Sequence, residues 1–88
     1  VICAQDELAV SAVKASFALK LKIPDDIVIT GYDNSLISYC STPEITSVDN
    51  HPDKLAVLAT ETFFKVLNGE SVEKKKVIDC KLVVRETT

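Results

Sequence analysis

The chain has 88 residues, of which 47% are hydrophobic and 26% are charged, a profile typical of one small soluble globular domain. Its net charge of −3 argues against a nucleic-acid surface on this segment, because phosphate binding needs a clustered positive field. No apolar run approaches the roughly 18 residues that a membrane span requires, and no signal-peptide pattern opens the chain. The chain lacks Met and opens on an apolar run, so we expect it to be the tail of a longer protein.

The first half of the chain predicts a strand, a helix and a second strand. Residues 1–4 form a short apolar run of the buried type, and residues 7–21 are Ala-rich with apolar positions at helical spacing. Asp6 is predicted to be the N-cap of this helix. A break around Pro24 precedes the β-branched run 27–30, which is typical of a buried parallel strand. Together these segments predict a βαβ unit with parallel strands.

The second half predicts two helices and two further strands. Residues 35–40 read as a short helix, and residues 45–48 as a third short strand. Residues 52–67 carry apolar side chains at steps of three and four, so they predict an amphipathic helix that begins at a proline. Alternation over residues 77–84 predicts a half-exposed or edge strand. The fold class is therefore α/β, a parallel sheet with flanking helices.

The candidate ligand site lies where the predicted parallel strands end. Gly31 permits a bend, and Asp33 follows the second strand, as Gln5 follows the first. Because parallel strands end at the same edge of a sheet, where α/β proteins bind ligands, we expect both side chains on one rim. An amide and a carboxylate there suit a hydroxyl-rich or nitrogenous small molecule. The alternative role for Asp33 is to cap the short helix that follows it.

Neither catalysis nor metal binding is indicated. His51 is the only imidazole; just before a proline at a helix start, it is expected to be an exposed capping residue and not a general base. The three cysteines, Cys3, Cys40 and Cys80, have neither CxxC nor metal-ligand spacing, which indicates reduced thiols in the cytosol. At least two of them lie inside apolar runs, where Cys is expected to act as a small hydrophobe. We therefore predict no enzyme, no metal and no cofactor.

Four blocks of sequence, in this order and spacing, resemble the C-terminal part of LacI/GalR-family transcription regulators. They are residues 6–9 (DELA), 23–33 (IPDDIVITGYD), 43–48 (PEITSV) and 82–88 (LVVRETT). The resemblance implies a fragment of a periplasmic-binding-protein-like type I fold, an effector-binding core with two α/β subdomains. It implies that residues 1–47 belong to the C-terminal subdomain, 48–51 to a hinge crossover, 52–69 to a helix of the other subdomain, and 70–88 to a returning C-terminal strand segment.

The resemblance also implies roles for single residues. The family's strand-end Asp, which binds effector hydroxyls or ring nitrogens, falls on Asp33, and a hinge amide that can reach the effector falls on Asn50. Gln5 stands where the family has Asn, and Pro52 stands where a bulky residue is common, so no stacking role is carried over. The family's dimerisation face is matched by Val10, Val13, Lys14, Ile37 and Cys40.

By this resemblance, the function is effector sensing and dimerisation in a cytoplasmic repressor of the LacI type. The partners are a small-molecule effector, expected to be a sugar, a second identical subunit, and operator DNA only through an N-terminal domain that this segment lacks; no membrane partner is expected. The alternatives are a fragment of a periplasmic sugar-binding protein or solute receptor, and a plain α/β enzyme domain. Alone, the segment is expected to self-associate, because its strand edges are unpaired.

Overall fold

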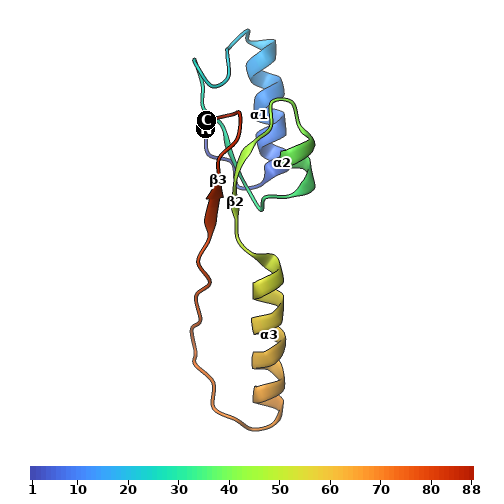
Figure 1. Cartoon of the computed structure of the whole chain (residues 1–88), viewed down its shortest axis with the longest axis vertical. Helices are drawn as coiled ribbons and strands as arrows, with labels where there is room; N and C mark the ends of the chain where they lie inside the picture. Colours follow the sequence, from blue (N-terminus) through green and yellow to red (C-terminus); the bar gives the residue numbers. More distant parts are fainter. The chain divides into compact units, whose positions relative to one another are not determined.

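A computed structural model describes all 88 residues and divides into two compact units, each described here by itself (Figure 1). Unit 1 comprises Val1–Asn50 and Lys81–Thr88, and unit 2 comprises His51–Cys80. The order of elements along the chain is α1, β1, α2, β2, α3, β3. Both termini therefore belong to unit 1, and the chain leaves this unit and returns to it once.

The sheet of unit 1 has three strands in the order β1-β2-β3. Strand β1 (Thr30–Tyr32) is parallel to β2 (Thr46–Asp49), and β2 is antiparallel to β3 (Lys81–Val83). In addition, Ile2 forms an isolated parallel bridge to Thr30. The parallel pairing predicted between residues 1–4 and 27–30 is present as this single bridge. The parallel sheet predicted for the chain is confirmed for β1 and β2, and the last strand adds an antiparallel edge.

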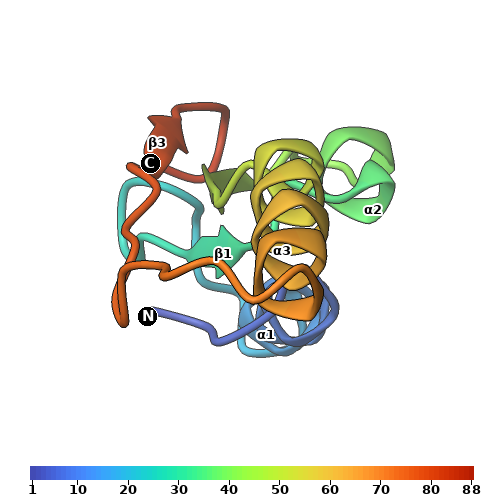
Figure 2. The same ribbon diagram turned by 90° about the horizontal axis from the view of Figure 1, so that it is seen from below.

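Helices α1 (Asp6–Ala18) and α2 (Leu36–Cys40) lie on the same side of this sheet in both ribbon views (Figures 1 and 2). The buried apolar core consists of Ala9, Val13, Ile29 and Ile45. The two α1 residues are four positions apart, so they lie on one face of the helix. This core is small, so hydrogen bonds between side chains and backbone also fix how the elements of unit 1 are arranged.

Three predicted strands, at residues 1–4, 27–30 and 77–84, are shorter or displaced in the structure. Residues 1–4 contribute one bridge, in which the Cys3 amide donates to the Thr30 carbonyl at 2.8 Å and the Thr30 amide to the Val1 carbonyl at 2.9 Å. The Ile29 amide donates to the carbonyl of Thr87 in the C-terminal tail at 3.0 Å, so β1 begins only at Thr30. In the predicted strand 77–84, the ladder covers only residues 81–83.

Helix α1 ends at Ala18, three residues before its predicted end. Lys20 has a left-handed backbone with φ 58°, and the Leu21 amide turns back to donate to the Ser16 carbonyl at 2.9 Å. This is the pattern that closes many helices. Leu21 therefore continues the apolar periodicity of the sequence without continuing the helix.

The prediction that Asp6 is the N-cap of α1 is wrong. Asp6 is the first residue of the helix, and its side chain is fully buried. Its Oδ2 accepts from the Ser35 amide at 2.7 Å and from Ser35 Oγ at 2.7 Å, and its Oδ1 accepts from Ser47 Oγ at 2.6 Å. A Cβ at Gly31 would collide with this carboxylate. Gly31 is thus required for the room it leaves beside Asp6, and not for the bend predicted from the sequence.

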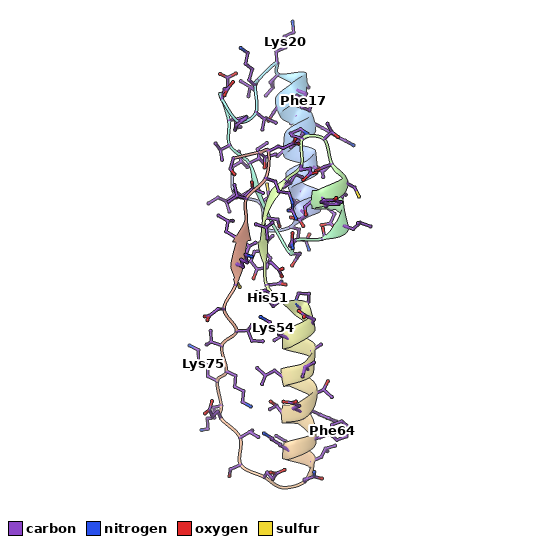
Figure 3. The ribbon with its side chains drawn as sticks, viewed as in Figure 1. Phe17, Lys20, His51, Lys54, Phe64 and Lys75 are labelled. Atoms are coloured by element: carbon purple, nitrogen blue, oxygen red, sulfur yellow. The ribbon has the colours of Figure 1, made fainter.

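Unit 2 consists of α3 (Pro52–Leu67) and the segment that follows it to Cys80. The helix has the predicted limits, and Gly69 just after it has a left-handed φ of 76°. No residue of unit 2 is buried. Lys76 Nζ donates to Thr62 Oγ1 at 3.2 Å, whereas Phe64 points away from the segment that carries Lys75 (Figure 3). One side of α3 thus faces its own following segment, and the rest of its apolar surface is exposed.

No helix of the structure is long and apolar enough to cross a membrane. All three cysteines are free thiols; Cys3 is half-buried, whereas Cys40 and Cys80 are exposed. Of the cysteines, of which at least two were expected to act as small hydrophobes, only Cys3 packs against the core of unit 1. Cys40 and Cys80 continue the apolar periodicity of their predicted elements, but no buried core of this chain lies against them.

We predict that Gly31→Ala destabilises the protein by about 1–3 kcal/mol, because the added methyl group displaces the buried Asp6 carboxylate. The free energy of unfolding is measured by urea denaturation of the full-length protein. Asp6→Ala in the same chain removes the group with which the methyl collides, so Gly31→Ala is expected to cost less in that background. Equal costs in both backgrounds would show that the Asp6 carboxylate is not the obstacle.

Candidate functional site

The turn that follows β1 contains two left-handed residues in succession, Asp33 with φ 99° and Asn34 with φ 48°. Asp and Asn are the side chains that tolerate this conformation best after glycine. The Asp33 amide donates to the Val48 carbonyl at 2.9 Å, and the Asn34 amide donates to Ser47 Oγ at 3.0 Å. Both hydrogen bonds join the turn to β2, so the direction of the two side chains is fixed by the backbone.

The same dipeptide, Asp-Asn, stands at the ends of both parallel strands, and the side chains of the two dipeptides pair crosswise. Asn50 Nδ2 donates to Asp33 Oδ1 at 3.0 Å, and Asn34 Nδ2 donates to Asp49 Oδ2 at 3.2 Å. Each amide thus serves the carboxylate of the other strand. The arrangement places two carboxylates and two amides at the carboxyl edge of β1 and β2, where α/β proteins bind ligands.

The two amide oxygens differ in their partners. Asn34 Oδ1 accepts from Arg85 Nη2 at 2.6 Å, whereas Asn50 Oδ1 is buried and has no hydrogen-bond partner. The reverse orientation of the Asn50 amide would set its oxygen against the Asp33 carboxylate. A buried carbonyl without a donor costs about 1–3 kcal/mol, and such a group in a native structure marks a place where a donor is expected.

Arg85 is the only arginine of the chain, and its side chain is 13% exposed. Its Nη1 donates to the Ile45 carbonyl at 2.8 Å and to Ser38 Oγ at 3.3 Å, and its Nε lies 3.9 Å from Glu44 Oε2. Because these partners fix the guanidinium, it holds Asn34 in place and sets a positive charge beside Glu44.

The structure brings together two of the three predicted ligand residues. Asp33 and Asn50 are joined by a hydrogen bond, and both are half-buried. Gln5 is exposed at the N-cap of α1 and makes no side-chain capping bond. The alternative role of Asp33 as a helix cap is wrong, because Ser35 occupies the N-cap of α2. His51 takes the N-cap position of α3, with no side-chain capping bond.

The sequence alone does not identify three residues of the site: Asn34, Asp49 and Arg85. Asn34 and Arg85 are 51 positions apart in the chain, so no local pattern joins them. The one available signal is the repeat of Asp-Asn at residues 33–34 and 49–50, close to the ends of two predicted strands.

Burial of the side chain argues against a role in the dimer at one of the five residues of the expected dimerisation face. Val13 is 4% exposed and packs in the core of unit 1, so its side chain is not available to a second subunit. Lys14, Ile37 and Cys40 are exposed, and Val10 is half-buried against the core.

The chain resembles known proteins over its whole length. It matches the family model of the periplasmic binding protein-like domain over residues 1–88. An HTH-type transcriptional regulator of Lachnoclostridium phytofermentans is 42% identical over 88 residues, covering 100% of this chain and 26% of the relative. The HTH-type transcriptional repressor PurR of Histophilus somni is 33% identical, covering 99% of this chain and 26% of the relative. The chain thus spans about a quarter of these curated relatives.

Two solved structures show how closely the fold agrees. A lac repressor dimer bound to operator and the anti-inducer ONPF superposes with a TM-score of 0.93 at 26% identity, covering 99% of this chain and 30% of that chain. A periplasmic binding protein/LacI transcriptional regulator from Alkaliphilus metalliredigens, complexed with D-xylulofuranose, has a TM-score of 0.88 at 31% identity, covering 99% of this chain and 33% of that chain. The predicted resemblance to LacI-type regulators is confirmed by these relatives. Because the family model matches every residue, the chain belongs to the family of periplasmic-binding-protein-like domains.

Proposed function

We propose that this chain is the effector-sensing and dimerisation segment of a LacI-type transcription regulator, and that Asp33 and Asn50 bind the effector. One observation carries the proposal: the Asn50 amide is held by Asp33 through its nitrogen, while its buried oxygen has no partner. The pair therefore has a fixed geometry and an unused acceptor. It lies at the carboxyl edge of two parallel strands, the usual place for a ligand in this class of fold.

The chemistry of the pair favours a ligand with several hydrogen-bond donors. Asp33 uses Oδ1 to accept from Asn50, so its second oxygen is free for a ligand. Asn50 Oδ1 is a second acceptor without a partner, and because it is buried, a ligand reaches it only when the atoms that cover it move. Two neighbouring hydroxyl groups of a sugar supply two such donors. Solved relatives include a CelR–cellobiose complex and the D-xylulofuranose complex, which supports a sugar. Gln5 remains a proposed third contact, with an exposed amide.

The proposed homodimer uses the exposed surface of α1 and α2. These helices contact each other, and apolar side chains stay exposed on both, among them Phe17, Leu36 and Tyr39. Such a surface is typical of a subunit interface. A lac repressor dimer is among the similar structures. We retain Val10, Lys14, Ile37 and Cys40 for the interface and leave out Val13.

The proposed mechanism is a population shift in a cytoplasmic regulator. An effector that binds one closure state better than the other changes their ratio, and operator affinity follows through the dimer. Residues 48–51 serve as the hinge crossover, 52–69 as a helix of the second subdomain, and 70–88 as the returning segment. DNA is contacted by a domain outside this chain. A periplasmic solute receptor has the same fold, but the names of the curated relatives favour a regulator.

We predict that Asp33→Ala weakens effector binding by about 1.5–3 kcal/mol, the cost of one charged hydrogen bond, which is roughly a 10- to 150-fold rise in dissociation constant. The measurement is calorimetry of the full-length regulator with D-galactose, D-ribose, D-xylulose and cellobiose. Asp25→Ala is the matched control, because Asp25 is an exposed turn carboxylate of the same unit. Equal affinity in the Asp33→Ala variant and the unmodified protein removes Asp33 from the site.

We predict that Ile37→Lys raises the dissociation constant of the dimer at least about tenfold, because it buries an unpaired charge at the proposed interface. Analytical ultracentrifugation of the full-length regulator measures this constant. Val28→Lys makes the same substitution outside α1 and α2, at a side chain that is 46% exposed, and it should leave the dimer intact. A dimer unaffected by Ile37→Lys would place the interface elsewhere.

A further inference from the structure

The two crossed Asp-Asn pairs are chemically alike, but only one of them has an unused acceptor. We propose that Asn34 is a positioning residue for the ligand pair: it ties the turn after β1 to Asp49 and Arg85, and thereby fixes Asp33 against Asn50. This inference rests on the proposed function of Asp33 and Asn50. Asn34 is engaged on both sides of its amide, because the nitrogen donates to Asp49 and the oxygen accepts from Arg85.

The first step of the argument is the strand register. Tyr32 pairs with Val48 in the parallel ladder, so a straight continuation would bring Asp33 beside Asp49. Like charges directly opposite each other are destabilising. The left-handed residues Asp33 and Asn34 break the ladder at this point, and each carboxylate then receives an amide donor from the other strand.

The second step is the orientation of Asn34. Arg85 can only donate, so its 2.6 Å contact fixes the Asn34 oxygen on the side of the guanidinium. The Asn34 nitrogen must then face Asp49. Arg85 is in turn held by the Ile45 carbonyl. Supporting contacts of this kind orient the groups that touch a ligand.

The third step is the requirement for asparagine at position 34. Its side chain supplies one acceptor for Arg85 and one donor for Asp49, and it tolerates the φ of 48°. Aspartate keeps the acceptor but replaces the donor with a charge that faces Asp49. Glycine keeps the turn at no steric cost and removes both side-chain bonds. These two substitutions separate the role of the side chain from the role of the backbone.

The test uses the full-length regulator and whichever of D-galactose, D-ribose, D-xylulose and cellobiose the unmodified protein binds most tightly by calorimetry. Asn34→Gly is expected to lower the affinity roughly three- to tenfold, and Asn34→Asp at least as much. Asn68→Gly, at the C-cap of α3, is the matched control and should bind normally. Normal binding by Asn34→Gly overturns the proposal; if that variant does not fold, Asn34→Asp decides in the same way.

A double-mutant cycle separates positioning from general loss of stability. If Asn34 acts by positioning Asp33, Asn34→Gly has no further effect on affinity in a chain that already carries Asp33→Ala. If the two substitutions lower effector affinity by independent factors that multiply in the double variant, the proposal is overturned. If the unmodified regulator binds none of the four sugars, the proposed sugar function fails. Amide hydrogen exchange at residues 33–35 then still decides: faster exchange in Asn34→Gly supports the positioning role, and unchanged exchange overturns it.

Discussion

The buried carboxylate of Asp6 is the interaction on which the arrangement of unit 1 depends. It is fully buried and accepts three hydrogen bonds from Ser35 and Ser47. A buried charge is tolerated only when donors surround it, and its place in the first turn of α1 also suits the positive end of the helix dipole. The start of α1, the turn after β1 and the middle of β2 are therefore fixed by one group. Gly31 follows from the same contact, because any larger residue would displace that carboxylate.

Local signals predicted the helices better than the strands. Helix α3 has the limits predicted from Pro52 and from the turn at Gly69, because its start and end depend on residues within one helical turn. Residues 27–29 form a β-branched run, yet the Ile29 amide bonds to Thr87, and no local pattern indicates that partner. A strand needs a neighbour, and the identity of the neighbour depends on tertiary structure. Helix α1 was predicted too long, because the apolar periodicity of the sequence continues to Leu21 although the backbone leaves the helix after Ala18.

The site could be predicted only in part for the same reason. Asp33 was identified by its place after a parallel strand, and Asn50 by resemblance to a family; the structure then joined them through one hydrogen bond. Arg85 could not be assigned, because its partners Asn34 and Ile45 are distant in the sequence. Gln5 met the same strand-end criterion as Asp33 but is exposed at a helix start. Position at a strand end is thus a useful guide to a site, but hydrogen-bond partners decide which side chains are held in place.

The ligand pair also lies where the chain passes from one unit to the other. Asn50 is the last residue of unit 1 before that passage, and His51, which follows, has a left-handed φ of 50°. The return passage is at Lys81, which pairs with Asp49 in the antiparallel ladder. If the proposed function holds, an effector that donates a hydrogen bond to the Asn50 oxygen binds close in the chain to both points at which the chain passes between the units. Hinges are commonly a few residues at the ends of elements. If residues 48–51 form the hinge as proposed, an effector bound to Asp33 and Asn50 would favour one backbone conformation of these residues without any change in the core around Ala9 and Ile45.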